Sequence, residues 1–319
     1  MNARTLCLLL SALPVMAMAA EPPFPTRPIR LIVPLAAGGG MDITARGIAF
    51  KMNDALGQNM IVDNRAGGGG AIAVDLTKAA PPDGYSLMMA SATLVIHPLL
   101  YKANYDPVKD FLPITQVSAQ PYVLVVNPSL PVTNTAEFIA YGKANPNRLN
   151  YASSGSGSLI HLTGELFKLS TGVSMVHIPY KGIGAAYPDL FANNIQLTFA
   201  SIISATPHVK SGKLRALAVT SRARARNMPE LPPLAESGVP GFDVTQWYGM
   251  FAPLSTPRPV IDKLQRAVAG ALTQPDVIAR MASEGSEPVG STPQAFTDHV
   301  KRELTKWSAV IKQTGVKGE

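Results

Sequence analysis

The chain has 319 residues, of which 15% are charged and 7% are aromatic, and its formal net charge is +7. A positive charge spread so thinly argues against a nucleic-acid binder, which concentrates its cations on one face. It suits a protein that captures small anions, or one that makes weak contacts with acidic membranes or partners. The single cysteine, Cys7, lies in an N-terminal segment that we expect to be removed, which excludes disulfides and thiol chemistry from the mature protein.

Residues 1–20 have the features of a secretory signal peptide. Arg4 is followed by an apolar stretch over residues 6–15 and then by small residues at 17–20. The apolar stretch is too short to cross a bilayer as a helix. We therefore predict cleavage near Ala19 or Ala20 and a periplasmic location.

The first part of the mature chain alternates apolar strands with helical patterns. Ala45, Ala49, Met52 and Leu56 recur at helical spacing, and Gly57 is a typical helix stop. Strands are predicted at residues 29–35, 60–63 and 85–90, with a helix after the glycines 67–70 and a turn at 82–84. The apolar run YVLVV is typical of a strand in the middle of a sheet.

A second series of the same kind follows. It predicts strands at residues 149–152, 176–179, 195–200 and 214–219, and a helix with the apolar stripe Leu159, Leu162, Leu166 and Leu169. Residues 222–241 are rich in proline and arginine, which predicts a surface loop with one short helix. Two helices are predicted in the tail, one with Ile261, Leu264, Val268 and Leu272, the other with Phe296, Val300, Leu304, Trp307 and Ile311.

This alternation predicts an α/β fold with mixed or parallel sheets flanked by helices. The apolar runs at 122–126 and 247–253 are predicted to cross between two lobes, once in each direction. Two such crossings allow the lobes to hinge around a cleft. We expect lobe 1 to comprise residues 21–124 and 248–319, and lobe 2 to comprise residues 125–247.

A strand that ends in a glycine loop and leads into a helix occurs twice, in LIVPLAAGGGMD and in LNYASSGSGSLIHL. Free amides at a helix start, together with the helix dipole, bind anions, and glycine lets the backbone approach closely. A lone glycine cluster more often makes only a tight turn. Two loops in matched context favour a pair of facing anion sites. Among Ser153, Ser154, Ser156 and Ser158, at least one is expected to serve only as a helix cap.

Asp42 follows the first glycine loop and has more than one interpretation. An acidic residue in the first turn is favoured by the helix dipole alone. Alternatively, Asp42 contacts a donor group of a ligand, such as an ammonium, or fixes the loop through Arg46.

Motifs for catalysis are sparse. The sequence contains no G-x-S-x-G, no G-x-G-x-x-G and no P-loop. A hydrolase using Ser156 with His161 or His177 as its base remains an alternative, although a structural histidine is the commoner case. His97, His208 and His299 lack metal-ligand spacing, so no metal site is predicted. The cluster Arg222, Arg224 and Arg226 is most simply a solvated face, with docking to a partner as the alternative.

Several ordered blocks resemble the tripartite tricarboxylate transporter receptors, also called Bug proteins, which are extracytoplasmic solute-binding proteins. The resemblance runs from about Pro25 to the C-terminus. Three of its blocks are RPIRLIVPLAAGGGMDITAR, NYASSGSGSLIHLTGELF and SGVPGFDVTQWYGMFAP. It implies a two-lobed periplasmic binding protein of type II, or Venus-flytrap, architecture that closes on a small organic acid, without catalysis, cofactor or metal.

The resemblance also implies which residues bind the ligand. In this family, backbone amides and bound waters between the two glycine loops hold a ligand carboxylate. Carried over to this sequence, the ligand-binding residues are Gly38, Gly39, Gly40, Asp42, Ser91, Thr93, Ser153, Ser154, Gly155, Gly157, Ser158, Ser201 and Tyr248.

The sequence departs from the family pattern at four positions. Ala37 and Ala66 stand where proline is usual, which loosens loops that depend on pre-organisation. Pro188 falls within what is usually an uninterrupted helix start, and Ser201 replaces an acidic or amide residue. The last change weakens any case for recognition of an amino group.

The implied partners are a small carboxylate and the subunits of a membrane transporter, and no nucleic acid. An alternative is a ligand sensor that presents its ligand to a membrane kinase. Aromatic acids, aliphatic dicarboxylates and acidic amino acids all remain open as ligands. We expect a monomer.

Overall fold

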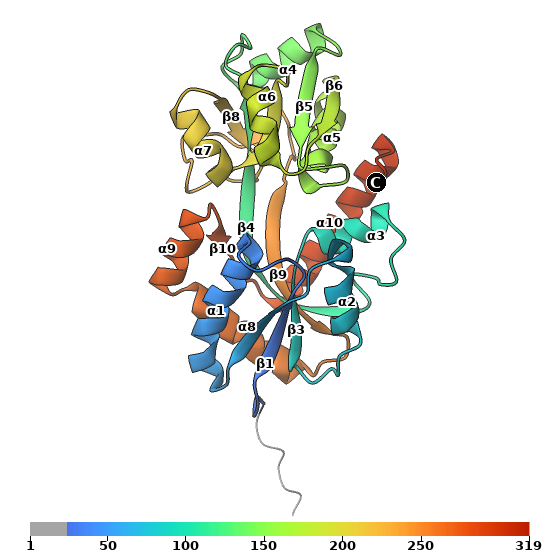
Figure 1. The fold of residues 1–319 in the computed structure, drawn as a ribbon, viewed down its shortest axis with the longest axis vertical. Coiled ribbons are helices and arrows are strands. Elements are labelled where there is room, and N and C mark those ends of the chain that lie inside the picture. The colour runs from blue at the N-terminus through green and yellow to red at the C-terminus, as the bar shows by residue number, and fades with distance from the viewer. Residues whose placement is uncertain (1–23, 319) are drawn as a thin grey trace, which may run out of the picture.

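The structure is a computed structural model that describes residues 24–318, so the predicted signal peptide lies outside the described residues. Figure 1 shows two lobes, one above the other, connected by the strands β4 (Phe111–Val126) and β9 (Thr245–Pro253). Between residues 24 and 318, no helix combines the length and the apolar character that crossing a bilayer requires.

Lobe 1, the lower lobe in Figure 1, is built on three parallel strands. In chain order its first elements are β1 (Ile29–Val33), α1 (Gly40–Leu56), β2 (Met60–Asn64), η1 (Gly68–Gly70), α2 (Ala71–Lys78), β3 (Ser86–Ser91) and α3 (Thr93–Leu100). The predicted apolar face of α1, with Ala45, Ala49, Met52 and Leu56, is buried. The chain returns to this lobe as α8 (Arg258–Leu272), α9 (Pro275–Ser283), β10 (Glu287–Pro288) and α10 (Pro293–Thr314).

Lobe 2, the upper lobe, repeats the parallel arrangement, with β5 between β6 and β7. Its elements are α4 (Thr135–Ala144), β5 (Leu149–Ser153), α5 (Leu159–Thr171), β6 (Met175–Pro179), η2 (Ile183–Ala186), α6 (Tyr187–Phe191), β7 (Leu197–Ser201), α7 (Ile202–Lys210), β8 (Arg215–Val219) and η3 (Leu234–Glu236). The α/β prediction with mixed and parallel strands is therefore confirmed.

The two crossing strands join the lobes into one continuous sheet in the order β2-β1-β3-β9-β4-β7-β5-β6, with β8 and β10 attached to β4. β9 lies antiparallel to β3 and to β4. β4 pairs with β9 up to Pro121, and from Tyr122 onward it pairs with β7 and β8. The partner of β4 thus changes at Pro121, a residue that cannot donate a ladder hydrogen bond.

Helix α10 contacts α3 in lobe 1 and α5 in lobe 2. Its Glu303 is 5% exposed and accepts hydrogen bonds from the indole Nε1 of Trp247 (3.3 Å) and of Trp307 (2.9 Å). Lys306 forms an ion pair with the same carboxylate. A buried charge is tolerated only when it is paired and hydrogen-bonded, and Glu303 meets both conditions. Its hydrogen bond with Trp247 links α10 to the start of β9.

Three local expectations are corrected. Residues 222–241 are not merely a surface loop, because Ala225, Leu234 and Val239 are buried against lobe 2. Leu169 is 43% exposed and so does not belong to the buried stripe of α5. Pro188 does not interrupt a helix; it stands in the first turn of α6, where its missing N–H costs nothing.

Candidate functional site

The first glycine loop connects β1 to α1 at the edge of lobe 1 that faces lobe 2. Gly39 is the N-cap of α1, and the first intrahelical hydrogen bond runs from the Ile43 amide to the Gly39 carbonyl (3.0 Å). The amides of Gly40 and Met41 precede that bond, so they have no acceptor within the helix. Gly38 adopts a φ of +85°, which disfavours other residues. The loop therefore presents amides of the kind that bind anions.

Asp42 holds this loop in place. Its side chain is buried, and Oδ2 accepts hydrogen bonds from the Gly38 amide (2.9 Å) and from Arg46 Nε (3.1 Å). Arg46 also donates to Asn64 Oδ1 (2.9 Å), and Asn64 Nδ2 donates to the Leu35 carbonyl (3.0 Å). Of the three interpretations of Asp42, the one in which it fixes the loop through Arg46 matches this geometry.

This arrangement predicts a pH dependence. Burial raises the pKa of the Asp42 carboxyl, but hydrogen bonds from Arg46 and Gly38 outweigh it, so the pKa lies below its ordinary value. An aspartate in the unfolded chain has a pKa of about 3.9. Because folding lowers the pKa of Asp42, its carboxylate contributes its full stabilisation above this value. The contribution is lost as the pH falls through the pKa of the folded state. We expect the melting temperature to fall less between about pH 6 and about pH 3 in Asp42→Asn than in the wild type. Equal falls in both proteins would contradict the bracing role.

The second glycine loop connects β5 to α5 in lobe 2 and follows the same plan. Ser158 is the N-cap of α5 and accepts a hydrogen bond from the His161 amide (3.2 Å). The Gly157 amide donates to His161 Nδ1 (3.0 Å). His161 thus holds the amide of the glycine before the N-cap, as Asp42 does in lobe 1. In both loops the bracing side chain stands in the first helical turn, four residues after the glycine.

Ser153 is fully buried beneath the second loop. Its hydroxyl donates to the Gly155 carbonyl (3.0 Å), accepts from the Gly155 amide (3.1 Å) and lies 2.6 Å from His177 Nε2. The rings of His161 and His177 stack, with 3.6 Å between their centroids. The hydroxyl of Ser153 is therefore committed to the loop, whereas Ser154 and Ser156 are only half-buried.

The capping role of Ser158 predicts a modest loss of stability on mutation. Ser158→Ala removes the acceptor of the His161 amide and is expected to lower the free energy of unfolding by about 1 kcal/mol. Ser156→Ala, two positions earlier on the same loop, is the matched control and should change it by less than about 0.5 kcal/mol. Urea denaturation measures both, and equal effects would show that Ser158 is not the cap.

A hollow of about 160 Å³ brings together several of the predicted residues of lobe 1. Ser91, Thr93 and Tyr248 line it, with Met41 from the first turn of α1. The Ser91 hydroxyl donates to Thr93 Oγ1 (3.3 Å). A Cβ at Gly40 would lie 3.4 Å from the Tyr248 hydroxyl, so the first loop meets β9 at this point.

The remaining predicted residues lie elsewhere. No residue of the second glycine loop lines this hollow, as far as residues 24–318 are concerned. That loop instead approaches the C-terminal end of α3, where a Cβ at Gly157 would lie 2.7 Å from Leu100. Ser201 is the N-cap of α7, pairs opposite Tyr122 in the sheet and donates its hydroxyl to Ser204 (2.9 Å).

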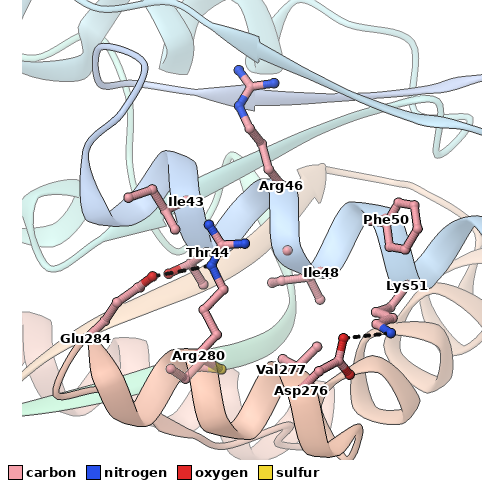
Figure 2. Close-up of a pocket in the computed structure, with 12 residues that line it drawn as sticks. Ile43, Thr44, Arg46, Ile48, Phe50, Lys51, Asp276, Val277, Arg280 and Glu284 are labelled. Atoms are coloured by element: carbon pink, nitrogen blue, oxygen red, sulfur yellow. Dashed lines mark ion pairs between the residues drawn. The ribbon is translucent and has the colours of Figure 1, made fainter.

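A second groove, of about 180 Å³, lies between α1 and α9 (Figure 2). Its charged side chains pair with one another: Lys51 Nζ lies 2.8 Å from Asp276 Oδ2, and Arg280 Nε lies 3.6 Å from Glu284 Oε1. Arg46, which also lines it, forms an ion pair with Asp42. Since these charges are already paired, the first glycine loop, with the hollow beside it, is the better candidate for binding an anionic ligand.

Comparison with known proteins identifies the family. A family model described as "Tripartite tricarboxylate transporter family receptor" matches residues 44–316, which includes both crossing strands and the second loop. The chain belongs to this family. Its members are periplasmic solute-binding receptors and not enzymes, so the hydrolase alternative at Ser156 is set aside.

Individual relatives agree with this assignment over nearly the whole receptor. Protein BugT of Bordetella pertussis is 36% identical over 297 residues, which cover 92% of this chain and 91% of BugT. The structure of R. palustris Rpa4515 with adipate is 36% identical, with a TM-score of 0.74, and covers 92% of this chain and 99% of that one. MatC (Rpa3494) from Rhodopseudomonas palustris with bound malate is 31% identical, with a TM-score of 0.69, covering 90% and 100% of the two chains.

Sequence reasoning missed some residues of this candidate site. Met41 and Gln246 line the hollow but carry no motif. His161 is structural, as expected, but its specific role in bracing the second loop was not predicted. Its role could have been found from spacing, because His161 follows Gly157 as Asp42 follows Gly38.

Proposed function

We propose that this receptor captures a small organic carboxylate between its two lobes and delivers it to a membrane transporter of the tripartite tricarboxylate type. The observation that carries the proposal is the matched pair of helix starts at α1 and α5. In each, a side chain of the first turn holds the amide of the preceding glycine. Backbone donors that are already held in position lose little conformational entropy on binding. They therefore bind an anion more tightly than the donors of a mobile loop would.

The chemistry of the relatives supports a carboxylate. One related structure contains adipate and another contains malate, which are both carboxylates. The first-turn amides of α1 and α5 suit such a group because they bind negative charge without a cationic side chain. One helix start in each lobe would let both lobes grip the same ligand when they close.

Further elements of the proposal follow from the sequence. We expect removal of residues 1–20 near Ala19 or Ala20, action in the periplasm as a monomer, and movement of residues 21–124 with 248–319 against 125–247. In the closed form we expect ligand contacts from Gly38, Gly39, Gly40, Asp42, Ser91, Thr93, Ser154, Gly155, Gly157, Ser158, Ser201 and Tyr248, with Ser153 supporting the second loop.

The test is a thermal-shift screen of the mature protein against carboxylic acids and the matched neutral amides. A ligand present at a hundred times its dissociation constant adds about 2.7 kcal/mol of stability, which raises the melting temperature measurably. At least one acid should raise it while its amide does not. If no acid in a broad panel does so, or if acid and amide are equivalent, the anion site is wrong.

A further inference from the structure

The hollow beside the first glycine loop has one polar edge, formed where α1 and α3 begin. Met41, in the first turn of α1, lies at this edge, and Ser91 and Thr93 add hydroxyl-bearing side chains. The remainder of the lining comes from the segment after β1, from η1, α2, β3 and α3, from the chain before β4, and from β9, which are far apart in sequence.

Apart from that edge, and from the amide of Gln246 and the hydroxyl of Tyr248 on β9, the walls are apolar. Val74, Met88 and Leu94 are almost completely buried side chains that line it. The hydroxyl of Tyr105 is used elsewhere, since it donates to the Leu94 carbonyl (3.1 Å). Burial raises the pKa of Tyr105 and of Tyr248, so both rings are neutral at physiological pH.

The lining contains no lysine, arginine, histidine, aspartate or glutamate among residues 24–318. A second carboxylate placed inside the hollow would lose its hydration without gaining a cationic partner. Burying an unpaired charge in this way is strongly unfavourable. The hollow is thus built to accept an uncharged group.

Its size limits that group. Apolar protein cavities of about 150 Å³ accommodate a benzene-sized molecule. The hollow, at about 160 Å³, is of this class. It suits an apolar group of about six carbons.

Leu35 supports the same conclusion from the rim. It lines the hollow, yet 48% of its surface is exposed, whereas most apolar side chains of this lobe are buried. An apolar ligand body at this position would cover it and gain about 25 cal/mol for each Å² removed from water.

We propose that the ligand is a monocarboxylate with an apolar body of about six carbons. Its carboxylate meets the amides at the start of α1, and its body fills the hollow. This inference rests on the proposed function. The receptor then discriminates by what stands at the far end of the ligand. A methyl group or a ring is accepted, and a second carboxylate is rejected.

Three six-carbon probes test this in the wild-type mature protein by isothermal titration calorimetry. Hexanoate is expected to bind at least about tenfold more tightly than adipate, which carries a second carboxylate in place of the terminal methyl group. Hexanamide, which lacks the charge, should bind at least about tenfold more weakly than hexanoate.

The outcomes separate this inference from the proposed function. If adipate binds as tightly as hexanoate, or if neither acid binds, the inference is overturned. The thermal-shift panel of acids and amides still tests separately whether the receptor binds a carboxylate. Hexanamide binding as tightly as hexanoate counts against the carboxylate site itself.

A charge placed at the rim gives a second test. Leu35→Arg supplies a cation to the hollow at a half-exposed position, and is expected to weaken hexanoate binding and strengthen adipate binding, each by about tenfold. Leu254→Arg is the matched control, because Leu254 is 49% exposed and does not line the hollow. If Leu35→Arg leaves the ratio of the two affinities as in the control, the ligand body does not occupy the hollow.

Discussion

Asp42→Ala is expected to bind its carboxylate ligand up to about tenfold more weakly than Asp42→Asn. Both variants lose the negative charge beside the anion site, so any gain from reduced repulsion is common to both. They differ in the brace: asparagine retains a carbonyl oxygen that accepts the Gly38 amide, and alanine retains no acceptor. A hydrogen bond between neutral groups contributes about 0.5–1.5 kcal/mol, and the upper end of this range corresponds to about tenfold in affinity.

The measurement is isothermal titration calorimetry of both variants with the acid found in the thermal-shift screen. Equal dissociation constants would show that the brace on Gly38 does not organise the site. The same titrations also test the interpretation in which Asp42 contacts an ammonium group of the ligand. In that case both variants would lose affinity for an amino acid and keep it for the same acid without its amino group.

Gly249→Ala is expected to destabilise the receptor by about 1–3 kcal/mol, at the upper end of this range. Gly249 lies in the middle of β9, opposite Ala90 of β3 and Gln116 of β4. A Cβ at this position would lie 2.0 Å from Cζ and 2.5 Å from Cε1 of Phe296. The ring of Phe296 is fully buried, 5.0 Å from the ring of Phe251 and 5.6 Å from that of Trp247, so it has no room to move away.

Urea denaturation monitored by circular dichroism measures the effect. Gly270→Ala is the control, because Gly270 lies in the last turns of α8 with no atom within 4 Å of an added Cβ. That change should stabilise the protein, by up to about 1 kcal/mol. The double variant Gly249→Ala with Phe296→Leu should be less unstable than the sum of its single changes, because the smaller side chain relieves the clash. A Gly249→Ala protein within about 1 kcal/mol of the wild type would refute the close packing of β9 on α10.

Several elements were predictable because their signal is local. The apolar spacing of α1 and the glycine that ends it identify that helix, and Gly57 does adopt a left-handed C-cap with a φ of 66°. The first half of β4 was missed because Pro113 and Pro121 argue against a strand. It forms nevertheless, because β9 pairs along its length and the register shifts at two places, one of them after Pro113. Helix α3 was also missed, and it contains Pro98.

The sequence alone determined the two glycine loops, the alternation of strands and helices and the family resemblance, because each depends on residues close together along the chain. Only the tertiary structure decided that His161 braces Gly157, that Ser153 is buried beneath its own loop, and that an uncharged hollow adjoins the first loop. The hollow is formed by residues as far apart as Leu35 and Tyr248. Their approach depends on the pairing of β3 with β9, a non-local contact that no local pattern encodes.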